Sequence, residues 1–164
     1  MGLNFYDMVD LVNKYHWDNW QEFPDELILA IFWEESTFTN GRQIGWKQGA
    51  VGFGQVEPST VTLANIWAKS TYPSDANWSP ADILTSDRKG VQITSRVLAR
   101  YYEAIGSVDS ALNAYAGSSN LHIPPRWKKC RDALVAMSDY SDSDAVKAAL
   151  KLAKPNSDPD AAYP

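Results

Sequence analysis

The sequence has almost no cysteine and little histidine. Cys130 is the single cysteine, and His16 and His122 are the two histidines. One cysteine cannot form an internal disulfide, and no Cys/His cluster has the spacing of metal ligands. We therefore expect no disulfide framework, no bound metal and no cofactor, and we expect both histidines to be packing or surface residues.

The chain also lacks an excess of positive charge and a long apolar run. Its 15 basic and 20 acidic side chains give a formal net charge of −5. No basic stripe is present, which argues against nucleic acid as a partner. No apolar run approaches the length of a membrane-spanning helix, so we expect no membrane insertion. Residues 1–7 are neither basic nor strongly apolar, so no export signal is visible.

Aromatic side chains, in contrast, are abundant. A chain of 164 residues with 45% hydrophobic content has the size and composition of one soluble domain with a proper core. Its seven Trp and eight Tyr suit a groove that stacks sugar rings or other flat apolar faces. They suit a Trp-rich core equally well, so both interpretations stay open.

The stretch ILAIFWEESTF at residues 28–38 ends an apolar run in two acids, a hydroxyl and an aromatic. As a helix it carries apolar residues in nearly every direction, which is typical of a buried helix. A carboxyl group at the end of such a helix is partly removed from water, and desolvation raises its pKa. Glu34 or Glu35 could therefore keep a proton near neutral pH and donate it.

Caps, prolines and hydrophobic spacing predict an all-α fold with no convincing strand. We expect helices over residues 5–15, 24–36, 58–67, 86–106, 110–115, 126–137 and 144–152. Residues 17–23 are interpreted as a turn or short helical piece, and residues 71–80 as a polar linker. Five glycines within 39–58 predict a packed loop or small hairpin that lines a cleft. One domain covers 1–154, and 155–164 form a flexible C-terminal tail.

Three short motifs lie on separate predicted elements. They are ESTF at 35–38, GAVGFGQVEP at 49–58 and ALNAYAG at 111–117. Together and in this order they resemble the soluble lytic transglycosylase family and its goose-type lysozyme relatives. The corresponding family patterns are Glu-Ser-x-Phe, Gly-x-x-Gly-Leu-Met-Gln-x-x-Pro and Ala-Tyr-Asn-x-Gly. The resemblance covers about residues 25–135 and implies a single lysozyme-like domain with a glycine-rich cleft loop.

The resemblance implies roles for the matching residues. Glu35, which precedes the serine, becomes the general acid and base. The candidate substrate-binding residues are Ser36, Phe53, Gln55 and Tyr115. Helix geometry alone does not choose between Glu34 and Glu35, because both directions are flanked by apolar side chains. Gln55 could also satisfy loop backbone groups, and Tyr115 could be an ordinary core residue.

Two positions depart from the family patterns. Gly54 stands where the family has Met, which keeps a close backbone approach but loses a side-chain contact. Ala116 stands where the family has Asn after the Tyr, unless Asn113 substitutes nearby. We expect both departures to affect how a substrate is placed.

The resemblance implies cleavage of the β-1,4 bond between N-acetylmuramic acid and N-acetylglucosamine in peptidoglycan. One buried acid suffices for a lytic transglycosylase, because the sugar's own C6 hydroxyl attacks and forms 1,6-anhydro-N-acetylmuramic acid. A muramidase that hydrolyses the same bond usually needs a second carboxylate, for which Glu57 and Glu34 are candidates. A non-catalytic glycan-binding or structural module is the alternative from another class.

The expected partners are peptidoglycan glycan strands, so the expected place of action is the bacterial cell wall in the periplasm. With no signal peptide visible, the chain fits a phage lysin, a virion component or a secreted effector that is carried to the wall. The sequence names neither a delivery partner nor an immunity partner.

Overall fold

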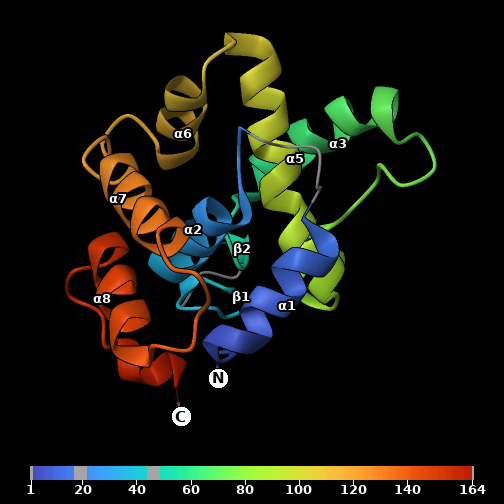
Figure 1. The fold of residues 1–164 in the computed structure, drawn as a ribbon. Helices are drawn as coiled ribbons and strands as arrows, with labels where there is room; N and C mark the ends of the chain where they lie inside the picture. Colours follow the sequence, from blue (N-terminus) through green and yellow to red (C-terminus); the bar gives the residue numbers. More distant parts are fainter. Residues whose placement is uncertain (1, 17–21, 44–48, 164) are drawn as a thin grey trace.

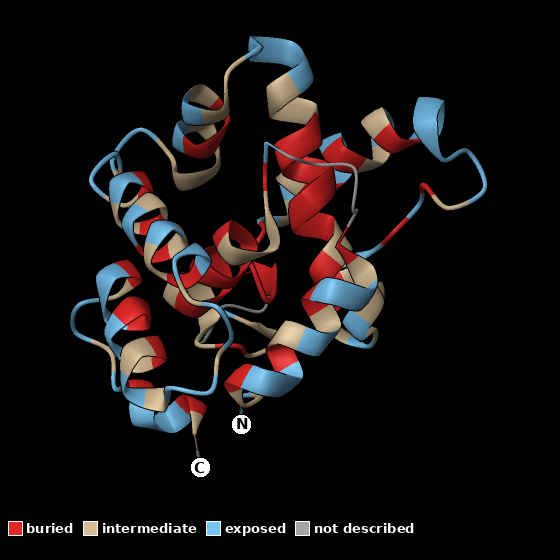
Figure 2. Cartoon of the chain, in the orientation of Figure 1, coloured by how far each residue is buried: buried red, intermediate tan, exposed pale blue. Residues whose placement is uncertain are grey.

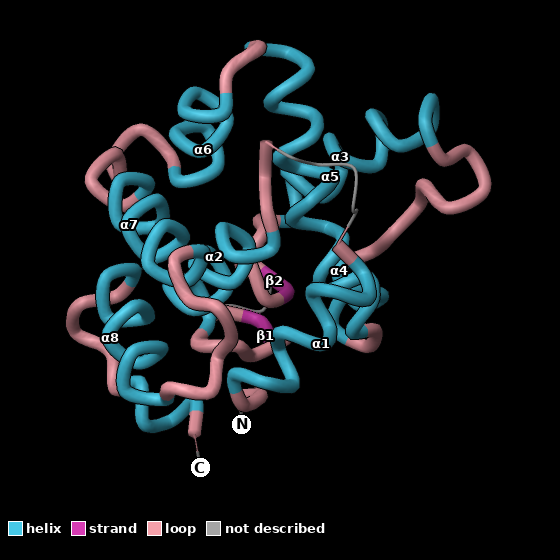
Figure 3. Tube along the Cα trace, viewed as in Figure 1, coloured by secondary structure: helices cyan, strands magenta, loops and turns pink. Residues whose placement is uncertain are grey.

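Helices form most of the protein (Figures 1 and 3). The computed structural model describes residues 2–16, 22–43 and 49–163. In chain order the elements are α1 (Phe5–Tyr15), α2 (Asp25–Ser36), β1 (Gly41–Arg42), β2 (Val51–Gly52), α3 (Pro58–Thr71), α4 (Pro80–Leu84), α5 (Asp87–Ile105), α6 (Val108–Ala116), α7 (Pro124–Val135), α8 (Ser143–Ala153) and η1, a 3-10 helix (Pro159–Ala162). The prediction of a mainly helical fold is therefore confirmed.

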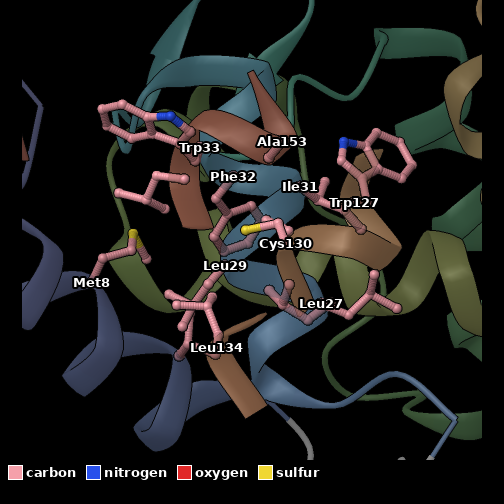
Figure 4. Packing of buried hydrophobic residues seen from close by; sticks show 14 of the residues in the cluster. Met8, Leu27, Leu29, Ile31, Phe32, Trp33, Trp127, Cys130, Leu134 and Ala153 are labelled. Carbon is pink, nitrogen blue, oxygen red and sulfur yellow. The ribbon is translucent and has the colours of Figure 1, made fainter. Parts of the chain in front are cut away.

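Helix α2 is buried on every side along its middle (Figure 2). Residues 27–33 are all at most 1% exposed. Helices α1, α7 and α8 pack against α2, and Figure 4 shows Trp127 and Leu134 of α7 and Ala153 of α8 in the same cluster as its side chains. Burying one large apolar side chain stabilises the fold by about 1.5–3 kcal/mol, so this helix anchors the main core. The burial predicted from its apolar residues is confirmed.

The glycine-rich segment contains a small hairpin, one of the two predicted alternatives. Strands β1 and β2 pair antiparallel, with Gly41 opposite Gly52 and Arg42 opposite Val51. Residues 44–48, between the strands, lie outside the described residues. So do residues 17–21, which cover most of the predicted turn before α2.

A second, smaller core lies under the hairpin. Its buried members come from the hairpin, α3, the linker after α3, α4 and α5, and are Val51, Val56, Val61, Ala64, Trp78, Ile83, Ile93 and Val97. Tyr101 of α5 and Tyr115 of α6 pack against this cluster and against the main core. The boundary between the two cores therefore passes beside these two tyrosines.

Most helix ends follow the expected capping residues. The Asn4 side chain accepts a hydrogen bond from the Asp7 N–H at 2.8 Å and starts α1, and Gly106, with φ of 80°, ends α5. Helix α7 begins at Pro124, two residues earlier than predicted. Its two prolines fit the first turn because the N–H groups of that turn have no hydrogen-bond partner within the helix, so proline loses nothing there. Helix α4 was not predicted. A capping box between Ser79 and Asp82 starts it, and it is only five residues long.

The predicted linker at 71–80 is attached to α5 by Arg96. The Arg96 side chain is 2% exposed and donates a hydrogen bond to the Asp75 carbonyl at 2.7 Å. Its guanidinium lies 3.6 Å from the centre of the Trp78 ring. A cation over a desolvated ring contributes about 2 kcal/mol. The linker is polar, as predicted, and these contacts hold it against α5.

The C-terminal segment differs from the expected loose tail. Ala162 of η1 is fully buried in the main core. The Tyr163 ring stacks on Phe5 of α1 with 6.1 Å between ring centres. Composition predicts disorder here because Pro, Asp and Ser dominate. The segment is nevertheless ordered, because Ala162 and Tyr163 pack on surfaces that α1 and α8 provide.

Deleting residues 159–164 should lower the free energy of unfolding by about 2–3 kcal/mol, because it exposes the core surface under Ala162. Thermal unfolding followed by circular dichroism should then show a Tm lower by roughly 4–12 °C. The control is Asn156→Ala, at an exposed position outside η1, which should leave Tm within about 1 °C. An unchanged Tm in the deletion would contradict the packing of η1.

Candidate active site

A cleft of about 580 Å³ opens where the end of α2 meets the hairpin, parts of α3, α5 and α6, and the segment between α6 and α7. This volume is within the usual range for small-molecule sites, about 300–1,000 Å³. Its polar lining consists mainly of acids, amides and phenols: Glu34, Glu35, Glu57, Gln43, Gln55, Asn120, Tyr101 and Tyr115. No Lys or Arg lines the cleft among the described residues. One predicted residue from each of the three motifs, Glu35, Gln55 and Tyr115, therefore reaches the same cleft.

The last turn of α2 carries the two adjacent acids to the cleft. The helix ends because Thr37 and Phe38 adopt left-handed backbone angles, with φ of 50° and 63°. The Thr37 N–H donates to the Trp33 carbonyl at 3.0 Å, and the Phe38 N–H donates to the Phe32 carbonyl at 3.4 Å. These two bonds satisfy carbonyls at the helix end. The chain therefore turns away just after the acids.

Glu35 holds its proton to unusually high pH. Burial raises the pKa of its carboxyl to about 9, and the charge of Glu34 and a hydrogen bond between the two side chains act in the same direction. The charge of Lys154 has the opposite effect. The C-terminal end of a helix is the negative end of its dipole, which also disfavours a carboxylate. Glu35 is thus a neutral acid at neutral pH, in agreement with the sequence argument.

Gln55 lies in a tight, strained turn of the cleft loop. Its φ is 49°, a conformation that costs a residue with a side chain about 1 kcal/mol or more. Its Nε2 donates to the carbonyls of Gly41 at 3.0 Å and Gly52 at 2.9 Å. Reciprocal backbone bonds between Val51 and Val56 close the same turn. The amide nitrogen therefore supports the loop, as one sequence interpretation proposed, while Oε1 is not used by these bonds.

Tyr115 joins α6 to the cleft loop. Its O–H donates to the Gly54 carbonyl at 2.6 Å, and its oxygen lies 3.0 Å from Thr94 Oγ1 of α5. A Cβ on Gly54 would overlap both hydroxyl oxygens, so only glycine allows this close approach. This explains the glycine at the position where the family pattern has Met. Burial, followed by the charge of Glu35, raises the pKa of Tyr115 well above its ordinary value.

Ser36 and Phe53, two of the predicted substrate-binding residues, are not part of the cleft lining. Ser36 Oγ donates to the Phe32 carbonyl at 3.1 Å and accepts from the Thr39 N–H at 3.1 Å, so it holds the end of α2. Phe53 is 1% exposed and packs on Phe32, with 5.6 Å between ring centres. In this structure both support the cleft wall rather than line it, so their assignment to substrate binding stays a prediction.

Asn113, offered as a replacement for the missing family asparagine, is exposed and is not part of the lining. Asn120 lines the cleft instead, and its Nδ2 donates to the carbonyl of Ala116 at 3.1 Å. Sequence reasoning missed Asn120 because it lies beyond the third motif. It also missed Gln43 and Tyr101, since neither belongs to a motif and Tyr101 fits the apolar spacing of α5.

Both candidate second carboxylates reach the cleft. Glu34 is partly buried and shares a hydrogen bond with Glu35. Glu57 is exposed and occupies the position before the first residue of α3. Its neighbour Pro58 starts that helix, so Glu57 also lies at the positive end of the helix dipole.

The remaining reactive candidates lie away from the cleft lining. His16 is buried, and its ring nitrogens lie 2.8 Å from Ser95 Oγ and 2.6 Å from the Phe23 carbonyl. His122 is exposed, whereas Cys130 is buried in the main core and burial raises its pKa to about 12. In the part of the chain that the structure describes, no group of three or more His, Cys, Asp or Glu could hold a metal ion. The helices described there are also too short or too polar to cross a membrane.

Comparison with known proteins leaves the family of the chain open. No protein-family model, no curated protein and no solved structure matches it. The three motifs and the geometry of the cleft are therefore what indicates a function for this chain.

Gly54→Ala should destabilise the protein by about 1–3 kcal/mol, because the added methyl group overlaps the Thr94 and Tyr115 oxygens. Urea unfolding measures the loss. The loss should be smaller in a Thr94→Ala/Tyr115→Phe background, where both oxygens are absent. Gly41→Ala is the matched control, since its Cβ would make only an ordinary contact, 3.4 Å from Thr39 Cγ2. Equal losses in the two backgrounds would contradict the proposed overlap.

Glu35→Gln should stabilise the protein at neutral pH. The folded-state pKa is raised above 4.5, so the folded form loses stability as pH rises from 4.5 towards about 9. Removing the acid should raise stability at pH 7 by on the order of 1–2 kcal/mol, or Tm by roughly 2–8 °C, and should have little effect at pH 4. Thermal scans at both pH values test this, with the exposed Glu22→Gln as control. A gain at pH 4 equal to that at pH 7 would refute the assignment.

Proposed function

We propose that the protein is a peptidoglycan-cleaving enzyme with a lysozyme-like domain, and that it acts as a lytic transglycosylase on the bacterial cell wall. The observation that carries this proposal is a protonated Glu35 in a cleft shared with Gln55 and Tyr115. A glycosidic oxygen is a poor leaving group until it is protonated. A carboxylic acid that is neutral near pH 7 can supply that proton.

Glu35 serves as acid and base in turn. It first gives its proton to the glycosidic oxygen while the bond from that oxygen to C1 of N-acetylmuramic acid breaks, and N-acetylglucosamine leaves as an alcohol. The C6 hydroxyl of the muramic residue then forms a bond to C1, and the Glu35 carboxylate takes the hydroxyl proton. The product is a 1,6-anhydro ring, and Glu35 ends the cycle protonated. No water is consumed, so no second carboxyl group is required.

Gln55 and Tyr115 shape the wall of the cleft around the acid. The Glu35 charge acts on the ionisation of Tyr115, which is consistent with their being close together. Tyr115 stays neutral at working pH and uses its proton to hold Gly54. Gln55 Oε1 is an acceptor suited to a sugar hydroxyl or an acetamido N–H. These groups orient the sugar, while Glu35 performs the proton transfers.

The arrangement of acids favours transglycosylation over hydrolysis. Glycoside hydrolases hold two carboxyl groups about 5–5.5 Å apart for a covalent intermediate, or about 6.5–9.5 Å apart with a water between them. Glu34 is the neighbour of Glu35 on α2 and shares a hydrogen bond with it, so it does not stand apart as a second carboxyl group. Glu57 also lines the cleft and is the acid that a muramidase would use. Muramidase activity through Glu57 is therefore the second candidate function.

Wild-type protein incubated with purified peptidoglycan should release 1,6-anhydro-muropeptides, identified by mass spectrometry. Glu35→Gln should lower the rate by at least about 100-fold, because it removes the acid and base, and Glu22→Gln should not change it. Products with ordinary reducing ends that disappear in Glu57→Gln would establish the muramidase instead. Binding of glycan without any cleavage by wild type would favour a non-catalytic module.

A further inference from the structure

The segment between α6 and α7 brings one amide side chain, that of Asn120, back to the cleft. Helix α6 is followed by Gly117, whose φ of 91° and ψ of 153° are accessible almost only to glycine. The Asn120 N–H donates to the Gly117 carbonyl at 3.0 Å, and the Ile123 N–H donates to the Asn120 carbonyl at 3.0 Å. Two consecutive turns therefore fix the backbone of Asn120 beside the end of α6.

The side chain of Asn120 is fixed as well. Its Nδ2 donates to the Ala116 carbonyl at 3.1 Å. Because a carbonyl oxygen only accepts, the amide nitrogen has to face it, and Oδ1 lies on the other branch of the amide. Within the described part of the chain Oδ1 accepts no hydrogen bond, and it is not a buried atom. Asn120 lines the cleft, so it offers an oriented acceptor there.

Apolar side chains flank this acceptor. Ala116, whose carbonyl holds Nδ2, and Ile123, which the second turn joins to Asn120, both line the cleft. Both are half-buried and pack against the main core. A sugar hydroxyl needs only the acceptor, whereas an acetamido group presents an N–H donor and a methyl group together. An amide oxygen between apolar side chains therefore suits an acetamido group better than a hydroxyl.

The other polar groups of the cleft also favour a ligand that donates hydrogen bonds. Glu34 and Glu57 present carboxyl oxygens, and Gln55 presents Oε1. Tyr115 uses its own proton on the Gly54 carbonyl. Among the described residues no Lys or Arg lines the cleft, so an anionic ligand would meet no cation there. A neutral sugar with N–H and O–H donors fits this lining.

We propose that Asn120 and Ile123, together with Ala116, form a subsite for the acetamido group of an N-acetylated sugar. Asn120 Oδ1 accepts from the acetamido N–H, and the two apolar side chains contact its methyl group. This inference rests on the proposed function. Both sugars of peptidoglycan carry an acetamido group, so the subsite sets which sugar ring lies beside Glu35. Asn120 thus determines binding and register, and it takes no part in the proton transfers.

The first test is the affinity for chitotetraose, an uncharged chain of N-acetylglucosamine units, in NMR titrations of Glu35→Gln protein. This background prevents cleavage of the probe. Adding Asn120→Ala should weaken binding about 3–10-fold, the loss expected for one hydrogen bond between neutral groups. The control is Asn113→Ala, at an exposed position of α6 outside the cleft lining, which should leave the affinity unchanged. An unchanged affinity in folded Asn120→Ala protein overturns the inference.

Two further measurements identify the acetamido group and do not depend on how well Asn120→Ala folds. Cellotetraose, which has a hydroxyl in place of each acetamido group, should bind at least about 10-fold more weakly than chitotetraose, because it loses both contacts. Equal affinities would overturn the assignment. In saturation-transfer NMR, the acetyl methyl signal relative to the ring protons should fall in Ile123→Ala. General loss of affinity lowers both signals together, so a constant ratio would contradict the methyl contact.

Cleavage kinetics separate this inference from the proposed function. Asn120→Ala in otherwise wild-type protein should raise KM for soluble peptidoglycan strands about 3–10-fold and change kcat much less. Chitotetraose binding that depends on Asn120, without cleavage of peptidoglycan by wild type, would support the subsite while refuting the proposed function. Cleavage with an unchanged KM in Asn120→Ala would refute the subsite alone.

Discussion

The burial of α2 is the constraint on which the rest of the structure depends. Residues 27–33 pack on every side, so the helix has almost no freedom to rotate or slide. Its last turn then carries two carboxyl groups to the rim of the cleft at a fixed depth. That depth removes Glu35 from water far enough to keep it protonated. The burial of α2 therefore both builds the main core and raises the pKa of Glu35.

The cleft contains two features that lower stability. A desolvated acid beside a second acid and a left-handed Gln55 both oppose folding. They cluster around one cavity, whereas the two cores that flank it are well packed. This distribution is typical of sites where activity requires groups that the folded state disfavours. The surrounding cores hold these groups in place.

Much of the fold could be predicted from the sequence, because local signals decide it. Asn4 and Gly106 set helix ends through caps, and the apolar run of α2 predicts a buried helix. Helix α4 was missed because five residues carry little periodicity. Packing of the C-terminal segment was missed because Ala162 and Tyr163 gain their stability only from distant surfaces on α1 and α8. Nonlocal contacts of this kind leave no pattern in neighbouring residues.

The sequence by itself determined the chemical groups of the candidate site: an acid at the end of a buried helix, a glutamine in a glycine-rich loop and a tyrosine before a glycine. Only the tertiary structure decided which motif residues face the cleft. It buried Phe53, used the Ser36 hydroxyl to hold the end of α2, and brought Gln43, Tyr101 and Asn120 to the cleft. The reason is physical: residue type sets what a group can do, whereas its pKa and accessibility depend on neighbours that only folding brings together.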